Sequence, residues 1–293
     1  MTINKTFRSI CLLLTVSLLV FSCKKKNSGT DAIVDFSILV NGDSVTFTNL
    51  TTGAVSYKWD FGDGTSSTDA SPVHVYPGKG KYVPTLYATI AGGGVLNGST
   101  VIHIAKTSPI RLNDNTLSDW DTISVNTYTS GSGGGSFIKA KFDYDANSVY
   151  FYFEMTATVA DGNIFDFYLD DDDNPATGLT TGLFTSGGYD ELLEGQLLLN
   201  QNTAPIPMTP YVHTGAQSAF SFSALSVTDY FVVGTIVQDG SVLKFEGSLD
   251  RSKLSLTGAA MRLGVTATKS DWSVTLGTLP DQDTDSYLLN LPD

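Results

Sequence analysis

Short runs of alternating apolar and polar residues recur along the chain from residue 32 onward, and each run predicts a β-strand. In the run NIFDFYLD, residues 163–170, Phe165, Phe167 and Leu169 fall on one face of the expected strand. Neighbouring side chains of a strand point to opposite faces, so such a run buries one face and leaves the other for polar groups. Glycine, asparagine and aspartate separate the runs, as is typical of turns. The pattern predicts an all-β protein.

The predicted strands fall into two groups. In residues 32–106, the runs 35–40 and 43–50 flank an Asn-Gly pair, which is a hairpin signal. Pro109 follows this group and disfavours helix before it, so we expect a linker near residues 106–111. Many short strands with glycine turns favour sandwiches, which here predicts one domain over 32–106 and a larger one over 110–293. Strands expected in the second group span residues 138–143, 149–155, 163–170, 230–238, 242–249 and 261–268.

The first 31 residues follow a different pattern. Lys5 and Arg8 precede a short apolar run, residues 11–21, which is too short to cross a bilayer. The sequence VFSC follows and resembles a bacterial lipobox, in which the signal is cut before the cysteine and lipid is attached to its sulfur. We therefore expect a lipoprotein signal peptide over 1–22, lipidation of Cys23 and a polar tether over 23–31. The alternative is an ordinary secretory signal with a chance cysteine.

The cysteine count agrees with this interpretation. Cys11 and Cys23 are the two cysteines of the chain, and Cys11 lies inside the segment expected to be removed. A lipidated Cys23 leaves no free thiol, which excludes disulfides, thiolate nucleophiles and cysteine metal ligands. We expect the protein to be anchored in the outer membrane through its N-terminal lipid, at the cell surface or on the periplasmic face.

The charge of the chain narrows the choice of partner. Thirty acidic residues against 17 basic residues give a formal net charge of −13, and the excess lies after residue 110, where 24 acidic residues face 8 basic ones. A surface of that sign repels phosphate backbones, so nucleic acid is not an expected partner. Neutral ligands and cations are compatible with it.

A motif of the first group carries a family resemblance. WDFGDG at residues 59–64 is followed by His74, Tyr76, Gly80 and Tyr82. This spacing closely resembles the polycystic-kidney-disease (PKD) domain, which implies an immunoglobulin-like sandwich. In it, the tryptophan and phenylalanine of the motif fill the core and its two aspartates hydrogen-bond the turn; the alternative is a tryptophan that stacks on a ligand. We expect the module to be a spacer.

A second resemblance covers most of the larger group. The segments 112–120, 139–155, 245–254 and 261–272 are similar to family-9 carbohydrate-binding-module-like and DOMON-like sandwiches. The resemblance implies a β-sandwich, often calcium-bearing, that binds sugars or, in some branches, haem. The sequence departs from the pattern because a pair of tryptophans that could enclose a sugar is not evident. His213 is the one histidine of this region, which disfavours haem.

Four consecutive aspartates in LDDDDNPATGL, residues 169–179, raise the question of a metal site. Calcium takes six to eight oxygen ligands, and a curved loop can direct alternate side chains inward. A second acidic cluster follows in GGYDELLEG, residues 187–195, and the resemblance pairs two such clusters. The alternative is a solvated turn whose charges deter edge pairing. The predicted calcium ligands are Asp170, Asp172, Asn174, Asp190 and Glu194.

The function expected from these features is non-catalytic glycan binding by the second domain. Sugar faces pack on open aromatic rings, and the candidate rings are Tyr150, Tyr152, Tyr168 and Trp272. Motifs of known hydrolases, such as G-x-S-x-G, do not occur, and we expect no enzyme. Two alternatives stay open: an adhesion or structural lipoprotein that binds another envelope protein, and a glycan-degrading enzyme.

Overall fold

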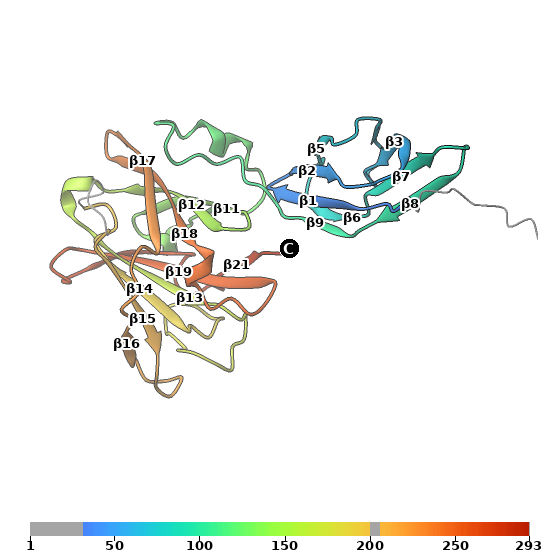
Figure 1. Cartoon of the computed structure of the whole chain (residues 1–293). Coiled ribbons are helices and arrows are strands. Elements are labelled where there is room, and N and C mark those ends of the chain that lie inside the picture. Colours follow the sequence, from blue (N-terminus) through green and yellow to red (C-terminus); the bar gives the residue numbers. More distant parts are fainter. Residues whose placement is uncertain (1–31, 200–205, 293) are drawn as a thin grey trace, which may run out of the picture.

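The computed structural model describes residues 32–199 and 206–292 and consists of two domains built from antiparallel sheets (Figure 1). The predicted all-β fold with two sandwich domains is confirmed. The predicted signal peptide and tether, including Cys23, lie outside the described residues. Within the described residues, no helix has the length and apolarity that a membrane span requires.

The first domain contains a three-stranded sheet in the order β1-β2-β5, a four-stranded sheet in the order β4-β3-β7-β8, and the pair β6-β9. The predicted hairpin is present, with Asn41 opposite Ser44 and Gly42 in the left-handed region at φ 61°. The strands are β1 (Phe36–Asn41), β2 (Ser44–Asn49), β3 (Ala54–Asp60), β4 (Ser66–Ser67), β5 (Val73–Val75), β6 (Gly80–Tyr82), β7 (Thr85–Ile90), β8 (Val95–Ser99) and β9 (Ile102–Ile104).

The WDFGDG motif forms the core and a turn of this domain, as expected. Trp59 is fully buried and Phe61 nearly so, so the tryptophan offers no open face to a ligand. The carboxylate of Asp60 accepts a hydrogen bond from the Gly62 amide at 3.0 Å, and that of Asp63 accepts one from the Thr65 amide at 2.9 Å. These bonds satisfy backbone donors in the turn that ends β3.

The second domain stacks two larger sheets. One has the order β10-β11-β12-β18-β17, and the other has the order β16-β15-β14-β13-β19-β20 with β21 paired to β19. Its strands are β10 (Thr127–Thr129), β11 (Phe137–Tyr144), β12 (Ser148–Thr156), β13 (Ile164–Asp170), β14 (Glu191–Gly195), β15 (Met208–His213), β16 (Phe222–Ala224), β17 (Phe231–Asp239), β18 (Val242–Asp250), β19 (Ala260–Thr268), β20 (Thr275–Leu279) and β21 (Tyr287–Asn290). Short 3-10 turns are η1 (Ser118–Thr122), η2 (Ser132–Gly134), η3 (Val159–Asp161) and η4 (Arg251–Lys253).

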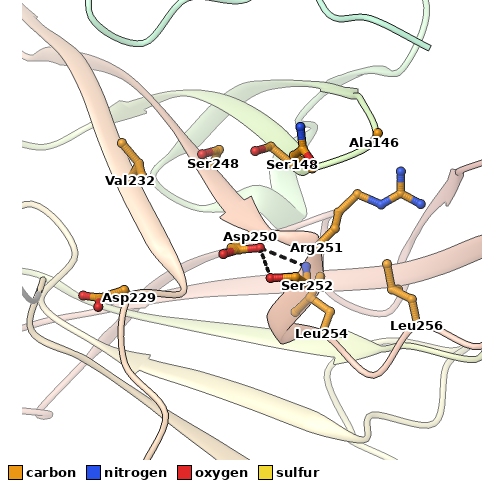
Figure 2. Close-up of a pocket in the computed structure, with 11 residues that line it drawn as sticks. Ala146, Ser148, Asp229, Val232, Ser248, Asp250, Arg251, Ser252, Leu254 and Leu256 are labelled. Carbon is orange, nitrogen blue, oxygen red and sulfur yellow. Dashed lines mark hydrogen bonds between the residues drawn. The ribbon is translucent and has the colours of Figure 1, made fainter. Parts of the chain in front are cut away.

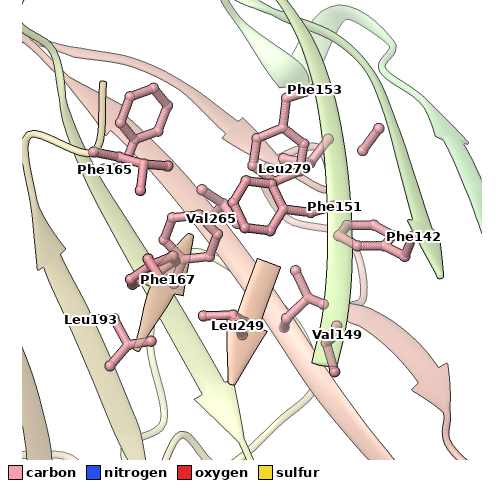
Figure 3. Packing of buried hydrophobic residues seen from close by; sticks show 14 of the residues in the cluster. Phe142, Val149, Phe151, Phe153, Phe165, Phe167, Leu193, Leu249, Val265 and Leu279 are labelled. Carbon is pink, nitrogen blue, oxygen red and sulfur yellow. The ribbon is translucent and has the colours of Figure 1, made fainter. Parts of the chain in front are cut away.

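Apolar side chains of both sheets meet between them and form the main core (Figure 3). Phe151 of β12 lies 5.5 Å, centroid to centroid, from Phe167 of β13, and Phe165 lies 5.7 Å from Phe245 of β18. These are the apolar positions of the alternating runs. Period-2 patterning therefore correctly identified the faces that pack together.

The outer faces of the two sheets are also partly covered. Residues 110–123 lie over the β12 side, where Trp120 is 1% exposed and its ring centroid is 5.6 Å from that of Tyr152. Residues 171–189 cover the β13–β19 face, where Phe184 packs so closely on Gly264 that a Cβ there would be 2.2 Å from its ring. These two coverings decide which outward side chains reach solvent.

Candidate functional site

The four consecutive aspartates at the end of β13 have different surroundings. Asp170 and Asp172 approach Asp190, and carboxylate oxygens of these three residues lie within 4.8 Å of one another. Asp173 instead forms an ion pair with Arg262, with 2.6 Å between Oδ1 and Nε. Asp171 points into the sandwich. The three residues that converge, Asp170, Asp172 and Asp190, are called the outer trio.

Backbone amides hold the outer trio in place. The Gly188 amide donates to Asp170 Oδ2 at 2.9 Å, and the Asn174 amide donates to Asp170 Oδ1 at 3.1 Å and Asp172 Oδ1 at 2.9 Å. The Asp171 amide donates to Asp190 Oδ2 at 3.3 Å. The trio therefore joins the turn after β13 to the start of β14.

Burial makes this cluster electrostatically costly. It raises the pKa of Asp190 to about 6, and the neighbouring charge of Asp172 adds to the effect. Burial also raises the pKa of Asp170, against hydrogen bonds from Gly188 and Asn174. Like charges held together out of water favour a proton or a cation.

The residues present fit a hard cation in part. Three carboxylates provide oxygen donors of the type that calcium prefers, while Asn174 does not complete the set. Its side-chain oxygen accepts from the Ala176 amide at 3.1 Å. Only its backbone N–H is directed at the trio, where it donates to Asp172. Glu194 is not at this site either: it lies four residues beyond Asp190 along the strand, roughly 13 Å away at 3.3 Å per residue, opposite Asp166.

Two of the four predicted sugar-binding rings are covered. Tyr152 is 7% exposed beneath Trp120, with its hydroxyl donating to Glu154 at 2.7 Å. Tyr168 is equally buried, in a cluster with Tyr189 and other residues of the covering loop. The prediction that these rings stack on a sugar is wrong, because chain segments already occupy their open faces.

Tyr150 is half-buried beside a surface pocket of about 690 Å³. It lies opposite Ser248 in the β12–β18 register, and its hydroxyl donates to Asp145 at 2.9 Å. The pocket is polar: in Figure 2, Asp250 accepts from the amide and hydroxyl of Ser252, and the Arg251 side chain extends away from that carboxylate. Among the described residues, none that lines this pocket is aromatic.

Trp272 is the predicted ring that reaches solvent, with 53% of its surface exposed. It lies in the β19–β20 turn, where its φ of 63° is in the left-handed region that bulky residues rarely adopt. The preceding residues Lys269, Ser270 and Asp271 line a pocket of about 310 Å³. Asp161 lines the same pocket from η3, so a flat ring follows directly on polar groups.

Some features of these surfaces were not evident from the sequence. The pocket beside Tyr150 is lined by residues of three separate strands and η4. It could be predicted only from the register in which these strands pair. Phe220, 66% exposed in the turn between β15 and β16, carries no sequence signal, because one apolar residue in a turn has no periodicity.

Comparison with known proteins identifies the first domain. Residues 28–104 match the PKD domain family, which confirms the resemblance predicted from the WDFGDG motif. Collagenase ColQ1 of Bacillus cereus is 35% identical over 79 residues, and collagenase ColA of the same species is 59% identical over 32 residues, both through the PKD region. These stretches are 8% and 3% of the collagenases, so the chain spans under a tenth of either relative.

Solved structures similar to the chain include PKD and carbohydrate-binding modules. The PKD1 domain of Vibrio cholerae metalloprotease PrtV is 35% identical, covering 25% of this chain and 95% of its own, with a TM-score of 0.24. A family-9 carbohydrate-binding module of Caldicellulosiruptor kristjanssonii, solved with cellotriose, is 12% identical, covering 59% of this chain and 78% of its own, with a TM-score of 0.30.

Proposed function

We propose that this protein is a lipid-anchored envelope protein whose second domain binds a neutral glycan without cleaving it. The observation that carries the proposal is Trp272, an exposed indole in the β19–β20 turn whose three preceding residues line a surface pocket. The C–H faces of a sugar pack on such a ring, and its hydroxyls exchange hydrogen bonds with neighbouring polar groups. Asp161, Asn163, Lys269 and Asp271 supply those groups.

The backbone at Trp272 supports a functional role. A left-handed conformation costs a bulky residue on the order of 1 kcal/mol or more, and such strain concentrates at binding sites. The turn is fixed by a hydrogen bond from the Trp272 amide to the Lys269 carbonyl at 2.9 Å. The ring is thus presented by an ordered turn, which limits the entropy lost on binding.

The charges at this pocket favour binding over hydrolysis. A glycosidase needs one carboxyl with a raised pKa that can protonate the leaving oxygen. Here hydrogen bonds from the Ser273 hydroxyl and amide lower the pKa of Asp271, so this carboxyl stays ionised. The acidic excess after residue 110 disfavours anionic glycans, which leaves neutral ones.

Alanine substitution of Trp272 tests the proposal. The Trp272→Ala variant should migrate faster than the parent in affinity gels that contain neutral polysaccharides, with about tenfold weaker binding, because truncating an aromatic anchor costs on the order of 1 kcal/mol or more. The matched control is Phe220→Ala, which removes another exposed ring from a different turn (66% exposed, against 53% for Trp272) and should leave retention unchanged.

Three outcomes would contradict the proposal or a part of it. Equal retention of parent and Trp272→Ala on each gel would remove this ring from the site. Retention on none of the gels, together with recovery of one envelope protein in a pull-down, would favour the adhesion function. Reducing ends that accumulate with purified protein would contradict the non-catalytic part.

Calcium belongs to the proposal as a stabilising ion. The outer trio of Asp170, Asp172 and Asp190 would hold it, with the remaining oxygens from water or backbone. Its role is structural, because the trio ties the turn after β13 to β14 and neutralising its charge removes the repulsion there. The Cys23 lipid would anchor the chain, with the PKD domain as a spacer.

A further inference from the structure

Two carboxylates beside the outer trio face the interior of the sandwich. Glu191 lies opposite Leu169 in the β13–β14 register, and cross-strand neighbours share a face, so it points to the core side. Asp171 follows Leu169 by two residues, which continues the inward series of β13. Asp171 is 1% exposed and Glu191 is 2% exposed. These two residues are called the inner pair.

The inner pair has few protein partners. The Ser255 amide donates to Asp171 Oδ2 at 3.3 Å, and the Ser255 hydroxyl donates to Glu191 Oε1 at 3.4 Å. Both bonds are long. The other oxygens, Asp171 Oδ1 and Glu191 Oε2, are buried and accept no hydrogen bond from the residues that the structure describes. A buried carboxylate oxygen without a donor costs several kcal/mol as an ion, so these carboxylates need either a proton or a cation.

Within the described residues, the positively charged side chains do not neutralise the inner pair. Arg262 pairs with Asp173, and the other ion pairs of the described chain lie elsewhere. Burial raises the pKa of both inner carboxyls, and the mutual repulsion of Asp171 and Glu191 contributes to that of Asp171. The same two charges, after burial, raise the pKa of the nearby Tyr230 to about 12.

We propose that Asp171 and Glu191 bind a second divalent cation, calcium, on the inner face of the sheet. Two carboxylates carry the charge that one divalent ion neutralises, and all groups at hand are oxygen donors. The Ser255 hydroxyl can rotate to offer a lone pair in place of its long hydrogen bond. This site does not depend on calcium at the outer trio.

Strand alternation explains how one short sequence serves two sites. Along residues 170–172 and 190–191, side chains point alternately outward and inward, so the outer trio and the inner pair lie on opposite sides of the same two segments. An ion on each side would hold the β13–β14 end of the sheet from both faces. A run of four aspartates is then two sets of ligands and one partner for arginine.

Calcium stoichiometry tests the proposal on the full chain. After treatment with chelator, equilibrium dialysis against calcium should give two ions per chain for the parent. The inner variant, Asp171→Asn with Glu191→Gln, should lose one ion, and the outer variant, Asp170→Asn with Asp172→Asn, should lose the other. Asp166→Asn, at a buried carboxyl away from both sites, should still bind two.

The outcomes separate the two sites. An inner variant that binds as many ions as the parent overturns the proposal and leaves a shared proton between the inner carboxyls. If the inner variant binds no calcium and the outer variant binds as much as the parent, the inner site is supported and the outer site is contradicted. Should the inner variant not fold, Ser255→Ala removes only a hydroxyl and should weaken one of two ions severalfold; two unchanged affinities would overturn the proposal.

Discussion

At the scale of single residues, burial sets the behaviour of carboxyls that the sequence presents as equivalent. Asp166 is 8% exposed on the outer face of β13. Its Oδ2 accepts from the Thr266 hydroxyl at 2.9 Å, while Oδ1 is buried and has no hydrogen-bond partner in the described part of the chain. Burial raises the pKa of Asp166 to about 6, with a smaller contribution from the charge of Glu194. The ionised form therefore destabilises the fold.

Asp166 should make the protein less stable as pH rises from about 4 to 6. The pKa of Asp166 is higher in the folded state than in the unfolded state, so the native state binds more protons in this window. The stability that this proton binding contributes is lost as the pH rises through about 6. Asp166→Asn keeps an acceptor for Thr266 and carries no charge. We expect it to exceed the parent in free energy of unfolding by roughly 1–3 kcal/mol at pH 7, and by less at pH 4.

Urea denaturation in chelator at the two pH values measures this difference. Asp121→Asn, at an exposed carboxyl, is the control and should match the parent at both. A parent that is as stable as Asp166→Asn at pH 7 would contradict the argument.

At the scale of elements, the loop over residues 171–189 both contributes to the outer trio and covers the outer face of β13 and β19. Leu179 and Tyr189 form a β-bridge that closes it, and the Gly188 amide donates to Asp170. Gly188 fits because it has no side chain: a Cβ would lie 2.1 Å from the Thr177 carbonyl oxygen and 2.7 Å from that of Asn174. The glycines of this loop therefore fix how closely its two arms approach.

Gly188→Ala should force these arms apart. Overpacking of this kind costs roughly 1–3 kcal/mol, and the displaced amide should also reduce the gain in melting temperature on adding calcium. Gly182→Ala is the matched control in the same loop, since a Cβ there meets nothing within 4 Å. Thermal unfolding with calcium and with chelator measures both effects. Equal results for the two variants would show that close approach at Gly188 is unimportant.

At the scale of the whole molecule, specific contacts join the two domains. Lys106 donates to Asp143 at 2.5 Å and to the Tyr144 carbonyl at 2.7 Å, and Ser108 donates to the second Asp143 oxygen at 2.6 Å. The Pro292 carbonyl accepts from Lys79 of the first domain at 3.2 Å. In Figure 1 the C-terminus lies near this junction. Linker and C-terminal residues thus fix the first domain to the second.

Cys23→Ser should release the protein from the membrane fraction. Stable anchoring takes two or more acyl chains, which a lipoprotein cysteine supplies and a serine does not. Cys11→Ser is the matched control, because that cysteine lies inside the segment expected to be removed. Cell fractionation followed by immunoblotting measures the effect. A Cys23→Ser variant retained as firmly as the parent would show that the lipobox interpretation is wrong.

The sequence by itself determined the strands with clear alternation, their inward faces and the nature of the first domain, whereas β10, β14, β15, β16, β20 and β21 were not predicted. Period-2 alternation is a local property, so Phe151, Phe153 and Phe167 could be placed in a core without knowing what they meet. WDFGDG is equally local, since its aspartates bond amides two residues away. The convergence of Asp170 and Asp172 also followed from their spacing, although their partner Asp190 was only inferred from the resemblance.

Tertiary structure alone decided which outward side chains stay free. Alternation places Tyr152 and Tyr168 opposite the core, but it does not reveal that Trp120 and the 171–189 loop fold over them. Likewise, Asn174 and Glu194 have side chains that could bind a cation. The turn geometry directs the Asn174 side chain to the Ala176 amide, and the length of β14 places Glu194 opposite Asp166, away from the outer trio. Coverage and convergence depend on contacts between segments distant in sequence, which no local pattern encodes.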